Sequence, residues 1–160
     1  MLTHRTPWLP ALALLILAAC AGETEQVEEA PAEAPSAEAP PPARPAGAAS
    51  VTITAPAEGA SVAGPAVNAV LTASGVTISP AGTMEPGTGH HHLFLDIDVT
   101  PMGEPIPAGT PGITHLGQAQ TEFTLEGVAA GQHRLIAVLA DGAHVPLDPP
   151  LVDTVMFTVP

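Results

Sequence analysis

The amino-acid sequence predicts an all-β domain, a sandwich or a barrel, over residues 51–160. No apolar pattern of helical length repeats there at the 3.6-residue period of an α-helix. Short apolar runs are separated by proline and glycine instead, and the whole chain contains 20 Pro and 15 Gly. Runs bounded in this way are typical of β-proteins with many short strands. About 110 residues are enough for one hydrophobic core, so we expect a single domain.

Six apolar runs are the predicted strands of this domain. They are Val51–Thr54, Ala66–Ala73, His91–Asp98, Glu122–Leu125, Gln132–Ala140 and Val152–Val159. The third run alternates most clearly, because its odd-numbered residues from His91 to Ile97 face one side and its even-numbered residues from His92 to Asp98 face the other. A further short strand is expected near Pro105–Ile113, which brings the total to about seven.

Two segments resemble parts of bacterial immunoglobulin-like domains. Thr52–Val62 is similar to their opening, in which a strand ends in a proline and a glycine turn leads to the next edge. Gly131–Leu135, followed by Leu139–Gly142, is similar to their penultimate strand. The resemblance implies an immunoglobulin-like β-sandwich of about seven strands.

Residues 1–20 resemble a bacterial lipoprotein signal. Arg5 gives a short basic start, and Trp8–Ala19 is an apolar run of 12 residues, shorter than the roughly 20 that span a bilayer. Small residues then lead into Cys20, the only cysteine of the chain, as in a lipobox. The resemblance implies cleavage after residue 19 and acylation of Cys20, so that lipid holds the protein on a membrane. The alternative is an ordinary secretory signal with a chance cysteine.

The segment after the predicted lipidation site, residues 20–50, is expected to be a disordered linker. It consists mainly of Ala, Pro and Glu and has no apolar residue larger than Val27, so it buries too little surface to offset the entropy of ordering. A glutamate-rich helix is the alternative, but five prolines between residues 31 and 42 argue against it. We expect a lipid-anchored protein on the periplasmic side of the cell envelope. Ala21, in place of Asp, favours the outer over the inner membrane in a Gram-negative host.

The chain is strongly acidic, with 16 Asp and Glu against three Lys and Arg and a formal net charge of −13 at pH 7. This charge repels nucleic-acid phosphates and anionic lipid headgroups. We therefore expect no nucleic-acid partner, and no membrane contact other than the lipid on Cys20. With Cys20 acylated, no structural disulfide is possible, so stability depends on an apolar core or on a metal.

Six of the seven histidines lie in the predicted domain. His90 and His92 are two residues apart on an extended segment, so their imidazoles share a face and are able to hold one ion. In an immunoglobulin-like topology, the starts of the strands at residues 91 and 122 lie beside the end of the strand at residue 140. This places the loop residues His115 and His144 at the same rim. Such a set of histidines suits copper or zinc.

Other residues near this rim have expected roles as well. Asp141 is a candidate metal ligand, or else a residue that orients a histidine. Met84 and Met102 lie in the loops that flank the third strand and slightly favour copper. His91 points toward the apolar face and is expected to be structural. His133 begins the strand at residue 132, so it should lie at the far end, roughly 25–30 Å away at ~3.3 Å per residue.

Five motifs follow one another in the domain: GHHHL (89–93), HLGQAQTE (115–122), GQHRL (131–135), DGAHVP (141–146) and DPP (148–150). As a set they resemble the bacterial domain of unknown function 4399, found in secreted and lipid-anchored proteins, over roughly Val67–Val159. The resemblance transfers no settled biochemical activity. The usual pattern of the family has His-x-His where this chain has Ile113-Thr114-His115. A metal site built on that pair would therefore have one ligand fewer here.

Three classes of function compete for this sequence. The first is a lipid-tethered module whose histidine rim binds a transition metal, copper or zinc. The second is a structural or protein-interaction module of the cell envelope, in which the histidines hold loops together by hydrogen bonds. The third is an enzyme, which we do not expect because no Ser/His/Asp or Cys/His arrangement is present and no phosphate-binding glycine loop precedes a helix.

Overall fold

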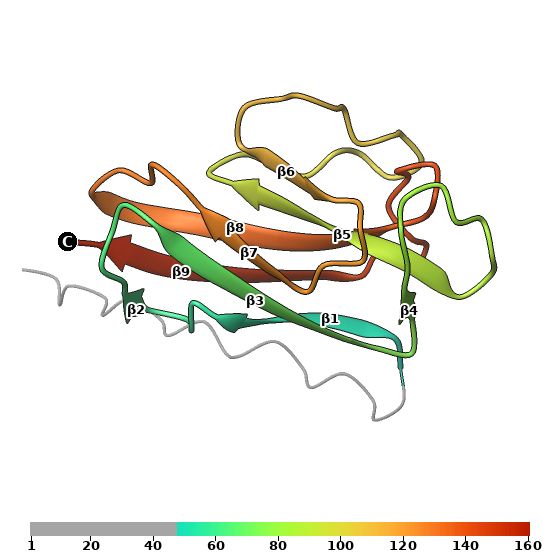
Figure 1. Cartoon of the computed structure of the whole chain (residues 1–160), viewed down its shortest axis with the longest axis horizontal. Helices are drawn as coiled ribbons and strands as arrows, with labels where there is room; N and C mark the ends of the chain where they lie inside the picture. The colour runs from blue at the N-terminus through green and yellow to red at the C-terminus, as the bar shows by residue number, and fades with distance from the viewer. Residues whose placement is uncertain (1–47) are drawn as a thin grey trace, which may run out of the picture. The chain divides into compact units, whose positions relative to one another are not determined.

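Nine strands and no helix make up residues 48–160, the part of the chain that the computed structural model describes (Figure 1). The predicted signal, Cys20 and nearly all of the predicted linker lie outside these residues. No helix able to cross a lipid bilayer occurs within residues 48–160. The strands are β1 (Ser50–Ala55), β2 (Ala60–Ser61), β3 (Val67–Ser74), β4 (Thr77–Ile78), β5 (Thr88–Leu95), β6 (Ile113–Leu116), β7 (Glu122–Leu125), β8 (Gly131–Ala140) and β9 (Val152–Val159).

The strands form two sheets. One sheet has three strands in the order β1-β3-β7, and the other has six, in the order β2-β9-β8-β5-β4 with β6 also paired to β5. The two-residue strands β2 and β4 pair in parallel with β9 and β5, and the other pairings are antiparallel. The order β1-β3-β7 against β9-β8-β5 is that of the A, B and E strands against G, F and C in immunoglobulin-like domains. The predicted all-β sandwich is confirmed.

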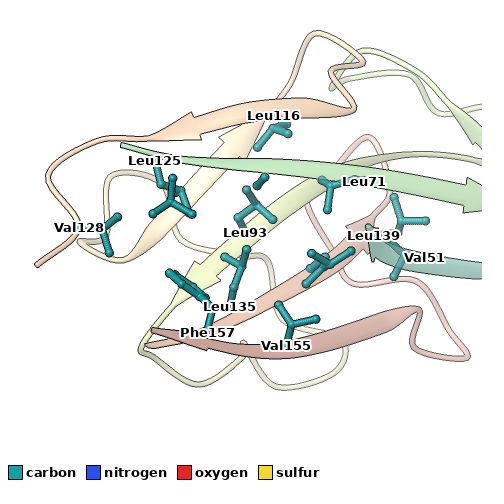
Figure 2. Packing of buried hydrophobic residues seen from close by; sticks show 14 of the residues in the cluster. Val51, Leu71, Leu93, Leu116, Leu125, Val128, Leu135, Leu139, Val155 and Phe157 are labelled. Carbon is teal, nitrogen blue, oxygen red and sulfur yellow. The ribbon is translucent and has the colours of Figure 1, made fainter. Parts of the chain in front are cut away.

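The main core lies between the two sheets (Figure 2). In β3, for example, buried Val67, Ala69 and Leu71 alternate with exposed Asn68 and Thr72. The largest fully buried apolar members of this core are Leu71, Leu93, Leu116, Leu135, Leu139 and Phe157. Full burial of one such side chain contributes about 1.5–3 kcal/mol, so the core supports the domain without a disulfide.

A second, smaller cluster covers the outer face of the six-stranded sheet. It consists of Phe94, Ile106, Ile136, Val138 and Ala140, with Ile97, Ile113 and Val152 packed against it. Because side chains alternate along a strand, Leu93 enters the main core while Phe94 enters this cluster. Both faces of β5 are therefore buried, and the long segment between β5 and β6 supplies part of the cover. The even-numbered histidines of β5 lie on this outer face.

Two details of the strand prediction were wrong. The predicted strand His91–Asp98 runs instead from Thr88 to Leu95, because the backbone of Asp96 turns to φ 59° and its carboxylate accepts a hydrogen bond from the N–H of Arg134. The strand expected near Pro105–Ile113 is absent from the described chain. Four prolines without an N–H and three glycines with positive φ keep residues 101–112 irregular, and pairing resumes in β6.

Candidate metal centre

Four imidazoles meet on the outer face of the six-stranded sheet. His90, His92, His115 and His144 each offer one nitrogen, and these nitrogens all lie within 4.8 Å of one another. The Nε2 atoms of His90 and His92 are 3.0 Å apart, and those of His115 and His144 are 3.3 Å apart. The four residues are those that the sequence placed at one rim, so the predicted convergence is confirmed.

Strand pairing explains how distant segments bring these rings together. His90 and His92 lie on one face of β5, and His92 is directly opposite His115 of β6. On the other side of β5, His90 is opposite Ala140, the last residue of β8, after which the chain turns toward His144. Figure 1 shows the start of β5 and the β8–β9 connection at the same end of the domain. Only His144 lies in a loop, whereas His115, which the sequence had also placed in a loop, belongs to β6.

Asp141 lies outside the group of four and organises the loop that carries His144. Its Oδ1 accepts hydrogen bonds from the N–H groups of Ala143 and Val145, both at 2.9 Å. Its backbone carbonyl accepts a hydrogen bond from the N–H of His144, and its own N–H donates one to the carbonyl of Val145. Of the two roles expected from the sequence, this geometry matches the orienting one. Its negative charge acts to raise the pKa of His90, but burial and the neighbouring His115 and His144 lower that pKa more strongly.

His144 has a left-handed backbone conformation, with φ 67°. For a residue with a Cβ this conformation costs about 1–2 kcal/mol. The Asp141 hydrogen bonds hold the turn, and the carbonyl of His144 accepts a further one from Ile106. The fold thus keeps a strained histidine where glycine would be relaxed, which points to a functional reason for the side chain.

Replacing the strained residue, His144→Gly, should leave the stability of the metal-free chain unchanged or raise it by up to about 1 kcal/mol, because the strain is relieved. His115→Gly is the matched control: it removes a ring from an ordinary strand and should destabilise. Urea unfolding in the presence of a chelator measures both. A loss of stability in His144→Gly as large as that in His115→Gly would show that the ring serves packing.

Three of the four rings, those of His90, His92 and His115, have a lowered pKa, which favours their neutral form. Burial first, and then the nearby His115 and His144, lower the pKa of His90 from 6.5 to about 4. Burial and the neighbouring His90 lower the pKa of His92 to about 3. The pKa of His115, whose side chain is largely exposed, is also lowered, by partial desolvation and then by His144. Neutral imidazole is the form that binds metals, so protons compete weakly at these nitrogens near pH 7.

The hydrogen bonding of these rings differs from that of the other two histidines in the domain. His91 donates Nδ1–H to the carbonyl of Gln120, and His133 contacts Asp96 through Nδ1 and the carbonyl of Ala129 through Nε2. Within residues 48–160, the four clustered rings have no hydrogen-bond partner except one another, and the Nδ1 atoms of His90 and His92 are buried without any. His133 is thus anchored through both ring nitrogens. His91 is anchored through Nδ1, while its Nε2 is buried without a partner, and none of the four is anchored to a group outside the cluster.

The other residues considered in the sequence analysis lie at various distances from this centre. His133 lies at the opposite end of β8, as expected. Met84 and Met102 are exposed, and neither belongs to the group of four. Gly117 was noted only as part of a motif, but a Cβ at this position would overlap the His115 ring, so glycine allows that ring its position. In the sequence, the only indication of this role is that Gly117 follows the candidate ligand His115 by two residues.

Comparison with known families places this site inside a defined domain. Residues 69–160 match the family described as a domain of unknown function (DUF4399), as its motifs suggested. The matched region includes all four histidines. No curated protein and no solved structure matches the chain.

Proposed function

The chain belongs to the DUF4399 family, and we propose that it binds one transition-metal ion, copper or zinc, through His90, His92, His115 and His144. The convergence of four imidazoles from two strands and a loop carries this proposal. Metal–nitrogen bonds of about 2.0–2.1 Å place neighbouring ligand nitrogens of a tetrahedral site roughly 3.3–3.4 Å apart. The observed separations of 3.0 and 3.3 Å are close to this spacing.

A purely structural role for the four histidines is disfavoured because their ring nitrogens contact no hydrogen-bonding group outside the cluster. A buried polar atom without a partner costs about 1–3 kcal/mol. The same domain holds His91 through Nδ1 and His133 through both ring nitrogens by hydrogen bonds to carbonyl or carboxylate groups, as expected of structural histidines. In the cluster, by contrast, the Nε2 atoms of the four histidines face one another and make no other hydrogen bond.

The donor set favours copper(II) over zinc(II). Imidazole binds both ions well, and for a given set of nitrogen ligands copper(II) binds more tightly than zinc(II). No thiolate is available within residues 48–160, because the only cysteine of the chain is Cys20. Together with the predicted lipid on Cys20, this suggests storage, delivery or sensing of the ion at the envelope membrane, outside the cytoplasm.

Equilibrium dialysis of the full chain against Cu²⁺ and Zn²⁺ at neutral pH tests the proposal. We expect one ion per chain, and a loss of affinity in His92→Ala greater than the roughly 10–100-fold that changes outside the ligand set cause. His133→Gln, which removes a histidine at the far end, is the matched control and should bind like wild type. Uptake that is equal in His92→Ala and wild type, or no uptake at all, contradicts the proposal.

A further inference from the structure

A small cavity opens beside the four-histidine centre. It has a volume of about 150 Å³ and is lined by the three rings of His92, His115 and His144. The rest of its wall is apolar or lacks a side chain and comes mostly from the β5–β6 connection: Pro105, Ile106, Pro107, Ala108, Gly109, Ile113 and Ala143. The buried His90 is not part of this lining, so it lies away from the cavity. The exposed His115 and Ala108 give the cavity access to solvent.

The proposed ligands leave the charge of a divalent ion uncompensated. All four are imidazoles, which supply no negative charge, and no residue of the cavity wall is acidic. The nearest carboxylate of the loop, Asp141, is engaged by two backbone N–H groups. A partly buried charge without a partner is costly, and an anion in direct contact with it lowers that cost.

We propose that the ion keeps a fifth coordination position, open toward this cavity, and that a small monoanion binds the ion there. This inference rests on the proposed metal-binding function and specifies the ligand class of the same site. A cavity of about 150 Å³ accommodates a molecule of roughly benzene size, so the anion is a small one. The chain as a whole is acidic, with a net charge of −13, so attraction for an anion must come from the ion itself.

Azide titration of the copper-loaded full chain is the test. Copper stoichiometry is measured first, and azide binding is then followed by the charge-transfer absorption of a copper–azide bond. We expect saturable binding to the loaded chain and none to the metal-free chain. Ala108→Leu and Ala143→Leu, which fill the cavity from two sides, should each weaken azide binding at least 10-fold while the chain retains one copper. Ala130→Leu, an exposed position between β7 and β8, is the matched control and should bind azide like wild type.

The outcomes separate this inference from the proposal on which it rests. Absence of copper uptake overturns the proposed function itself. One copper per chain without an azide band overturns only the open position. Unchanged azide affinity in both leucine variants, or loss of copper from both, also overturns the inference, since the cavity is then either not the binding space or part of the ion site itself.

Discussion

Saturation with Cu²⁺ should raise the midpoint of thermal unfolding of this protein by more than about 10 °C. A ligand that binds only the folded state stabilises it by about 4.1 kcal/mol at 1,000 times its Kd. For a domain of this size, each kcal/mol shifts the midpoint by roughly 3–6 °C. The ion would add direct bonds between β5, β6 and the β8–β9 loop through four imidazoles that otherwise contact only one another.

The effect should be specific to the folded chain because the four ligands are widely spaced along the sequence. They extend from residue 90 to residue 144, so the unfolded chain must close a long loop before it can offer the full set. Excess chelator should restore the lower midpoint. His115→Ala should abolish the shift, whereas His133→Gln should retain it. A midpoint that is the same with metal and with chelator would contradict the proposed site.

The sandwich was predictable from sequence because its strands obey a simple local rule. Alternation of buried and exposed residues in β3 is visible in the chain itself, and turn residues separate the runs. The boundaries of β5 were not predictable in this way. Its extension to Thr88 depends on pairing with β4, and its end depends on hydrogen bonds between Asp96 and residues 37 and 38 positions away.

The candidate site was predictable in part. The two-residue spacing of His90 and His92 fixes a shared face in any extended segment. Their meeting with His115 depends on the register of β6 against β5, and β6 itself was not predicted. The left-handed turn at His144 and the cavity wall from the β5–β6 connection depend on tertiary hydrogen bonds and packing, which no local pattern reports.

Acidification should destabilise the metal-free domain by about 3–5 kcal/mol between pH 6.5 and 4.5, from His90 and His92 alone. Both residues have an ordinary pKa of 6.5 when unfolded, and the fold lowers these values to about 4 and about 3. Between these limits the unfolded chain binds protons that the folded chain does not, so stability falls with the pH. His115 and His144 reinforce the shift of His90, and Asp141 opposes it. A loss of this size is comparable with the whole stability of a typical domain.

Urea unfolding in chelator at several pH values measures this slope, and two variants identify its source. His92→Gln removes one titrating ring. It should reduce the slope by about 1.4 kcal/mol per pH unit, which is the contribution of one proton taken up on unfolding. In His133, hydrogen bonds to Asp96 and then to the Ala129 carbonyl raise the pKa, so its contribution is complete below pH 6.5 and is lost as the pH rises through that raised value. His133→Gln should therefore change the profile on the alkaline side and leave the acid slope intact. A wild-type profile that is flat from pH 6.5 to 4.5 would mean that these buried rings accept protons without opening the fold.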